Sequence, residues 1–336
     1  MKKILVTGGG GFLGQRIIQL LKASAESVPI INYSRSRYSE LDKMGVESIP
    51  GDLTDYQKLS KAAQDCQAIF HVAAKAGIWG NYKEYYRINY QGTLNVLRIC
   101  NELKIEKLIY TSTPSVVHSQ ESLTGVNENI PYCTHRYSNY AYSKMLAERA
   151  VLNNNQSHVK TIALRPHLIW GPGDPHLLPR VLDRAKKGKL LRIGDGNNLV
   201  DITYIDNAAQ AHIDAYRALE SNPNCIGKAY FISQGTPVSL WSFINEIIEL
   251  AGLTKITRSI SSTQAYYLAT LMEFIHSIFP FLGEPKLTRF SVHQLNYSHW
   301  FSIEAARKDL RYNPTISTTE GLTKIAEWAR NYVKSA

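Results

Sequence analysis

A glycine-rich loop near the start of the chain restricts its fold more than any other feature. The segment TGGGGFLG, residues 7–14, follows an apolar run at 3–7 and opens a helical pattern at 14–25. Glycines at 8, 11 and 14 allow a tight turn, close approach of a ligand to the backbone and close packing of helix on strand. Because a helix N-terminus presents free N–H groups, this placement predicts a site for the pyrophosphate of a dinucleotide. The predicted contacts are Gly8, Gly11, Phe12, Leu13 and Gly14.

Short β-branched runs alternate with helical patterns through the first half of the chain. The runs cover residues 3–7, 28–33, 68–74, 107–112 and 161–166, and the helical patterns include 14–25, 86–103 and 141–154. Continuous apolar strands that alternate with helices are typical of a parallel sheet covered on both faces. We therefore expect an α/β fold with a doubly wound parallel sheet of the Rossmann kind.

The pattern changes after residue 166. Turn-rich segments occupy 171–180 and 194–198, a helix and a strand at 202–219 and 228–234 return to the sheet, and the remainder is mainly helical. We expect residues 1–170 plus 201–235 to form a Rossmann domain that binds the dinucleotide. Residues 171–200 plus 236–336 are expected to form a smaller substrate-binding domain over the carboxyl ends of the strands, where open α/β sheets bind ligands.

Bulk composition excludes several classes of protein. With 336 residues and 44% hydrophobic composition, the chain can bury a large core. The net charge of +10 comes from scattered lysines and arginines, so we expect no nucleic-acid partner. The four cysteines stand singly, and the N-terminal apolar run is too short for a signal peptide. These features predict a cytoplasmic protein with reduced thiols and no metal.

The end of the second expected strand distinguishes the kind of dinucleotide. Its residues INYSRSR carry Arg35 and Arg37 and no acid. An acid at this place accepts from a ribose 2′-hydroxyl, whereas an arginine accommodates a 2′-phosphate. We therefore favour NADP(H), with NAD(H) as the alternative, and Arg35 as the candidate contact. After the third strand, in GDLTD, Asp52 is a candidate for the adenine amino group beside Leu53, or else a turn residue.

A tyrosine and a lysine lie four residues apart in RYSNYAYSK, residues 136–144. Of the 20 tyrosines, Tyr140 alone has a lysine, Lys144, four positions later. On a helix this spacing places both side chains on one face. A lysine near a phenol lowers the pKa of the phenol and lets it exchange a proton near neutral pH. We expect Tyr140 to be the catalytic acid or base, and Tyr137 and Tyr142 to be packing residues.

A hydroxyl at the end of the strand at 107–112 is the expected third member, because the reacting oxygen of a substrate needs a hydrogen-bond donor there. Three candidates stand together in IYTSTPS: Thr111, Ser112 and Thr113. The residues alone leave the choice among them open.

The motifs TGGGGFLG, YAYSK and TYIDNAAQAH, in this order, resemble the extended short-chain dehydrogenase/reductase family over nearly the whole chain. The resemblance implies a Rossmann domain, a C-terminal substrate domain and catalysis by Tyr140 and Lys144, with Thr113 as the hydroxyl. His167 is a candidate acid, but we favour a loop histidine beside the cofactor. The resemblance also implies further cofactor contacts by Ala73, Ala74, Lys75, Pro166 and Leu168.

Longer segments, among them LRPHLIWGPGDPHLLPR, are similar to the 3β-hydroxysteroid dehydrogenase branch of that family. The chain resembles most the bacterial reductases of this branch that act on 2-alkyl-3-oxoalkanoates, so we expect reduction of such a lipid-like 3-keto acid. Oxidation of a 3β-hydroxysteroid or a sterol-4α-carboxylate is the alternative. A nucleotide-sugar epimerase and a dinucleotide sensor without catalysis are further alternatives. Arg180 or Arg184, at helical spacing after the GPGD loop, is a candidate for the substrate carboxylate.

Segment 265–283, AYYLATLMEFIHSIFPFLG, is apolar along one helical face but too interrupted to span a membrane. Packing in the core of the small domain is the expected use, with a lid over the substrate or a peripheral membrane contact as alternatives. The resemblance also implies a homodimer, formed through the helical patterns at 86–103 and 140–152.

Overall fold

A parallel sheet is the main element of the computed structural model, which describes residues 2–24, 28–133, 136, 138–154 and 158–335; Tyr137 lies outside the described residues. The strand order is β12–β7–β5–β4–β1–β2–β3. The strands are β1 (Lys3–Thr7), β2 (Ile30–Ser34), β3 (Glu47–Pro50), β4 (Cys66–His71), β5 (Lys107–Thr111), β7 (Lys160–Pro166) and β12 (Lys228–Ile232). The order reverses between β1 and β4, which confirms the expected doubly wound fold.

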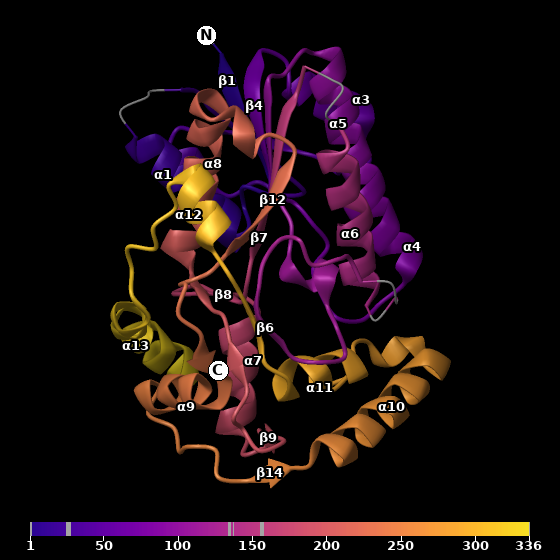
Figure 1. Cartoon of the computed structure of the whole chain (residues 1–336), viewed down its shortest axis with the longest axis vertical. Helices are drawn as coiled ribbons and strands as arrows, with labels where there is room; N and C mark the ends of the chain where they lie inside the picture. Colours follow the sequence, from indigo (N-terminus) through magenta and orange to yellow (C-terminus); the bar gives the residue numbers. More distant parts are fainter. Residues whose placement is uncertain (1, 25–27, 134–135, 137, 155–157, 336) are drawn as a thin grey trace.

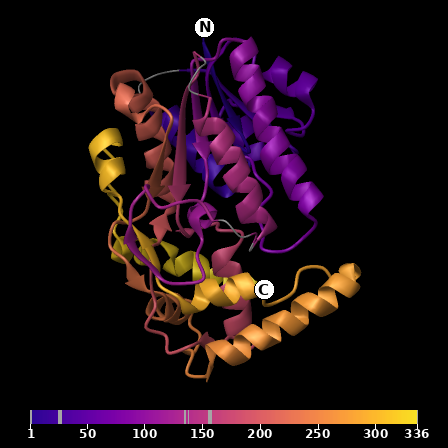
Figure 2. The same cartoon turned by 45° about the vertical axis from the view of Figure 1, so that its right-hand side comes forward.

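Helices cover both faces of this sheet (Figures 1 and 2). One face carries α1 (Phe12–Ala23), α2 (Ser39–Lys43), α8 (Ile205–Ser221) and α12 (Glu304–Leu310), and the other carries α3 (Tyr56–Ala62), α5 (Gly92–Glu102) and α6 (Asn139–Leu152). Successive side chains of β1 point to opposite faces, so Ile4 and Val6 join one buried cluster and Leu5 joins the other. Burial on both sides explains why the strands read as almost uninterrupted apolar runs.

One expected helix is interrupted. The segment 86–103 contains a π-helical turn, η1 (Tyr86–Gln91), followed by α5, and the short helix α4 (Tyr82–Tyr85) precedes it. Asn89 in this turn is buried, and its side chain donates to the carbonyl oxygen of Lys75 at 3.1 Å and to the Ser143 hydroxyl at 3.0 Å. Its amide oxygen accepts from the Lys75 N–H at 2.7 Å. The wider turn thus joins the segment after β4 to α6, and π turns are frequent beside functional sites.

The C-terminal part lies at the carboxyl ends of the large sheet and is mainly helical (Figure 1). Its helices are α7 (Leu177–Lys186), α9 (Leu240–Leu250), α10 (Ser262–Ile278), α11 (Arg289–Asn296) and α13 (Thr318–Ser335). Within the described residues, no helix of the chain is long and apolar enough to cross a membrane.

Short strands complete this part and tie it to the first half. A four-stranded sheet joins β13 (Val238–Ser239), β10 (Leu199–Val200), β15 (His299–Phe301) and β6 (Leu123–Val126). Two pairs stand apart: β8 (Ile169–Trp170) with β11 (Thr203–Tyr204), and β9 (Arg192–Ile193) with β14 (Ser259–Ile260). Because β6 comes from the first half of the chain, the four-stranded sheet links the two parts.

Helix α10 was expected to pack in the core of the small domain, but it does not. Only Ala265 and Ala269 are buried among its residues, all of which the structure describes. The apolar face that includes Leu271 and Ile278 is exposed, and α10 lies at the edge of the molecule in both views (Figures 1 and 2). Periodicity shows which side chains share a face but not what covers that face, so the expectation of core packing was wrong.

Candidate active site

The glycine loop and the strand ends enclose a cleft of about 380 Å³. Gly8 has a φ of 71°, and a Cβ placed on it would lie 2.8 Å from the Ala73 backbone. A Cβ on Gly14 would lie 2.2 Å from the Gly8 carbonyl oxygen. No described side chain caps the N-terminus of α1, so its first N–H groups are available to an anion. The cleft therefore fits a dinucleotide whose pyrophosphate rests on the loop.

Most of the predicted contact residues lie around this cleft. Pro166 and Leu168 do not line it, because the chain turns at Leu168, with a φ of 39°, and continues into β8. The other predicted contacts do: Gly8, Gly11, Phe12, Leu13, Gly14, Arg35, Asp52, Leu53, Ala73, Ala74, Lys75, Tyr140 and Lys144. His167 is buried outside it, with Nε2 3.1 Å from Nδ1 of His299.

Sequence reasoning missed part of the wall. Ser34 and Tyr38 line the cleft beside Arg35, and Asp174 and His176 line it from the loop before α7. The buried carboxylate of Asp174 accepts from the backbone N–H groups of residues 176, 177 and 178 at 2.8, 3.2 and 2.9 Å. An acid shortly before a helical pattern is a helix-start feature, so Asp174 was a signal in the sequence for an ordered loop here.

Tyr140 and Lys144 line the cleft together with Thr111 and Ser112, whereas Thr113 lies behind Tyr140 and is not part of the cleft wall. Tyr140 and Lys144 lie one turn apart on α6, and the Thr113 hydroxyl is hydrogen-bonded to the Tyr140 phenol. The Lys144 ammonium is buried and donates to the Thr111 carbonyl oxygen at 2.6 Å. Strand β5 and helix α6 thus hold the three predicted groups together.

The structure distinguishes the three candidate hydroxyls. Nδ1 of His212 lies 2.7 Å from the Ala208 carbonyl oxygen, so it carries the proton and Nε2 accepts from the Thr111 hydroxyl at 2.8 Å. The Ser112 hydroxyl is buried and makes no hydrogen bond to the described residues. Thr113 alone of the three contacts both Tyr140 and the Ser115 hydroxyl, the latter at 3.2 Å.

Burial controls the charges of this group. It lowers the pKa of Lys144 to about 7, although the carboxylate of Glu148 acts in the opposite direction. It also raises the pKa of Tyr140, which the hydrogen bond from Thr113 partly offsets. Lys144 was expected to lower the pKa of this phenol, but in the structure desolvation outweighs any such effect. Tyr140 is therefore protonated at neutral pH and suited to donate a proton.

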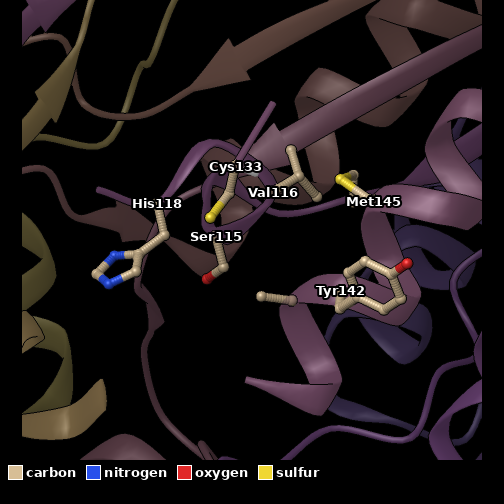
Figure 3. A pocket seen from close by; sticks show the side chains of 7 residues that line it. Ser115, Val116, His118, Cys133, Tyr142 and Met145 are labelled. Carbon is tan, nitrogen blue, oxygen red and sulfur yellow. The ribbon is translucent and has the colours of Figure 1, made fainter. Parts of the chain in front are cut away.

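A second, small cavity adjoins these residues (Figure 3). Ser115 and Val116 of the turn η2 (Pro114–Val117) lie around it, with Cys133 and His118 beside them. Tyr142 and Met145 of α6 lie across from His118. Its volume is about 10 Å³, the size of a single water molecule. Tyr142 belongs to the packing of this region, as expected.

The two arginines proposed for a substrate carboxylate contact another segment. The Arg180 guanidinium donates to the Glu284 carboxylate at 3.1 Å, and Arg184 donates to the Lys286 carbonyl oxygen. Both side chains thus hold the chain between η4 (Pro280–Leu282) and α11 against α7.

A Rossmann sheet, a glycine loop and a hydroxyl–tyrosine–lysine group define an oxidoreductase of the extended short-chain dehydrogenase/reductase class. Within that class the chain belongs to the 3-beta hydroxysteroid dehydrogenase/isomerase family, whose sequence model matches residues 5–261.

Two relatives and one solved structure illustrate the likeness. A 2-alkyl-3-oxoalkanoate reductase of Shewanella oneidensis is 44% identical over 328 residues, which cover 95% of this chain and 84% of the relative. A sterol-4-alpha-carboxylate 3-dehydrogenase, decarboxylating, of Mus musculus is 33% identical over 97% of this chain and 90% of the relative. The UDP-glucuronic acid 4-epimerase of Bacillus cereus in complex with NAD has a TM-score of 0.77 at 23% identity, covering 98% of this chain and 99% of that one. This last likeness shows the fold.

Proposed function

We propose that this protein is an NADPH-dependent reductase that converts the ketone of a 2-alkyl-3-oxoalkanoate into a secondary alcohol. The observation that carries the proposal is that Tyr140 and Lys144, one helical turn apart, both line the cleft behind the glycine loop, with the Thr113 hydroxyl bonded to the Tyr140 phenol. The 44% identity to a 2-alkyl-3-oxoalkanoate reductase supports this substrate class. The 33% identity to a sterol dehydrogenase supports oxidation of a sterol 3-hydroxyl as the second candidate, which is the same exchange in reverse.

Each catalytic residue has one task in the proposed reaction. When bound in the cleft, a reduced nicotinamide would supply the hydride that the ketone carbon accepts. The Thr113 hydroxyl donates a hydrogen bond to the ketone oxygen and holds it beside the phenol. Tyr140, which burial keeps protonated, gives its proton to that oxygen as the C–O double bond opens. The Lys144 ammonium stabilises the phenolate that remains and binds the cofactor ribose.

The preference for NADPH rests on the end of β2. Arg35 lines the cleft there, next to Ser34, whose hydroxyl accepts from the Gly10 N–H at 3.2 Å. No acid stands at this point to accept from a ribose 2′-hydroxyl. We assign the 2′-phosphate to the Arg35 guanidinium, and the remaining cleft-lining contacts to the rest of the cofactor.

The proposal extends to domains and assembly. Residues 1–170 plus 201–235 would bind the cofactor and 171–200 plus 236–336 the substrate, with β6 and α12 packing across that division. We place the protein in the cytoplasm, as a homodimer through α5 and α6, in peripheral contact with a membrane.

Replacement of the phenol tests the reaction. Tyr140→Phe is expected to lower kcat by about 10²–10⁴-fold and to leave NADPH binding intact, because only the proton donor is lost. Tyr142→Phe, on the same helix, is the matched control and should keep wild-type turnover. Wild-type turnover by Tyr140→Phe would exclude the mechanism.

The substrate is tested by following NADPH and NADH with 3-oxo acids, ketosteroids and sterol carboxylates. Faster turnover of 3-oxo acids with NADPH is the expected result. Preference for a sterol would favour the second candidate. Isomerisation of a nucleotide sugar without net consumption of cofactor would indicate an epimerase, and absence of turnover with every substrate would indicate a sensor.

A further inference from the structure

Helix α10 and the turn after it present a continuous apolar surface to solvent. Of the twelve large hydrophobic side chains exposed in the described residues, nine lie between residues 267 and 282. We name these nine the α10 face: Tyr267, Leu268, Leu271, Phe274, Ile275, Ile278, Phe279, Phe281 and Leu282. Phe281 is 82% exposed, Tyr267 71% and Phe274 62%. Exposed apolar patches of this extent mark interaction sites in soluble proteins.

The α10 face is built on a helix that is fixed from its other side. Tyr267, Leu271, Phe274 and Ile278 recur at helical spacing, so they form one stripe along α10. The opposite side is narrow and buries Ala265 and Ala269, and α10 packs against α11. A capping box at Ser261 and Gln264 closes the N-terminus of the helix. The rest of the protein therefore holds α10 in place with its apolar stripe outward.

Acidic side chains next to the face are neutralised. Glu273, the one acid of α10, is 12% exposed and pairs with Arg289 at 2.6 Å. Glu284, after the turn, pairs with Arg180 at 3.1 Å. The face therefore carries no uncompensated carboxylate among these residues.

Two exposed cations flank the face along the chain. Arg258 is exposed shortly before α10, and Lys286 is exposed shortly after the turn; neither makes an ion pair within the described part of the chain. The whole chain carries a net charge of +10. An apolar helical face flanked by cations along the chain is complementary to an anionic lipid surface, where the stripe enters the boundary between headgroups and acyl chains and the cations contact phosphates. A second copy of the chain would bring like charges together.

From these features we infer that the α10 face docks on the surface of an anionic phospholipid bilayer. The inference rests on the proposed function in one respect: a long-chain 3-oxo acid partitions into such a bilayer, so docking would bring the enzyme to its substrate. The active-site cleft and the docking face then belong to one molecule that works at the lipid surface. Docking itself needs neither substrate nor cofactor.

Vesicle flotation of the full-length protein tests the inference. Wild-type protein should float with vesicles of phosphatidylcholine and phosphatidylglycerol, more weakly with phosphatidylcholine alone, and less as salt is raised. The double variant Phe274→Ser with Phe281→Ser should lose at least about tenfold in partitioning, because each phenyl ring contributes apolar burial. Leu199→Ser, which removes an exposed leucine outside the face, should float like wild type. Arg258→Glu with Lys286→Glu should lose the preference for anionic vesicles.

Two outcomes would overturn the inference. The first is wild-type protein that stays unbound with both kinds of vesicle. The second is sedimentation showing that the Phe274 and Phe281 variant dissociates an oligomer of the wild type in the absence of vesicles, which would assign the face to a second copy. Turnover of a short, water-soluble 3-oxo acid, measured on the same samples without vesicles, separates this test from that of the proposed function: flotation without turnover rejects only the reaction, and turnover without flotation rejects only the docking.

Discussion

Glu148 and Arg165 form a buried ion pair one helical turn beyond Lys144. Nη2 of Arg165 lies 2.6 Å from Oε1 of Glu148, and the two side chains are 3% and 0% exposed. The Tyr132 phenol donates to the same carboxylate at 2.7 Å. Burial lowers the pKa of Lys144, and the Glu148 carboxylate acts in the opposite direction and raises it. The pair therefore belongs to the electrostatic environment of the proposed catalytic group.

The charge on Lys144 should follow this ion pair. His71, Tyr110 and Tyr140 also face Lys144, but none carries a charge at neutral pH, since burial lowers the pKa of His71 and raises those of both phenols. Because the proposed mechanism needs the protonated lysine, activity should fall as pH rises through the pKa of Lys144. Glu148→Gln should move this alkaline limb of kcat/KM to lower pH by about one unit, because Arg165 keeps its charge.

Arg165→Met should move the same limb to higher pH. Each single variant should also lose about 3–5 kcal/mol of unfolding free energy, because one buried charge is left unpaired. The control is the double variant Glu148→Gln with Arg165→Met, whose limb should return near that of wild type. If the variants lose activity at every pH while the alkaline limb of kcat/KM stays at the wild-type pH, the ion pair has only a structural role.

Asp201 should make the stability of the protein depend on pH. Its carboxylate is buried, accepts from the Phe301 N–H at 2.7 Å, and has a pKa raised by burial to about 6. Between pH 4 and 6 the folded state therefore binds more protons than the unfolded state, and the free energy of unfolding falls as pH rises through this window, by about 3 kcal/mol.

Asp201→Asn keeps an oxygen that can accept from the Phe301 N–H and removes the carboxyl group that titrates. Buried histidines such as His167 and His299 have lowered pKa values and act in the opposite direction, so the difference between variant and wild type is the quantity to measure. Urea unfolding at several pH values should show the variant gaining relative stability from pH 4 to 7. A constant difference would contradict the assignment.

The Asp174 carboxylate should stabilise the start of α7. Asp174→Ala removes the acceptor for three backbone N–H groups and is expected to cost about 1–2 kcal/mol in urea unfolding, whereas Asp174→Asn should recover part of this. Asp195 also accepts from a backbone N–H two residues on, but it is exposed and in a turn. As the control, Asp195→Ala should cost less than about 0.5 kcal/mol. Equal costs would show that the cap at α7 has no special role.

Arg35 should decide between the two dinucleotides. Arg35→Ala is expected to raise the KM for NADPH by about 10–100-fold and to leave the KM for NADH unchanged, because it removes a charge-assisted contact to the 2′-phosphate. Arg37 is exposed and does not line the cleft, so Arg37→Ala is the matched control. If both variants lose NADPH affinity equally, the effect is general surface charge rather than recognition by Arg35.

Local patterns in the sequence were sufficient for the strands, the glycine loop and the spacing of Tyr140 and Lys144. Apolar runs define buried strands, and a spacing of four residues on a helix defines a shared face, because both depend on backbone geometry over a few residues. The order of these motifs along the chain then places them at the carboxyl ends of one parallel sheet. The doubly wound fold and its family follow from these features.

Contacts between distant segments decided the rest. The Thr111 hydroxyl is hydrogen-bonded to His212, which lies 101 positions later in the chain. This contact distinguishes the role of Thr111 from that of Thr113. Glu148 meets Arg165 only because α6 packs on β7, and η1 widens where Asn89 reaches Lys75 and Ser143. The face of α10 has the periodicity of a core helix, yet it is exposed. A periodic pattern records which side chains point the same way, whereas the partner they meet depends on how remote elements pack together, and that arrangement exists only in the folded chain.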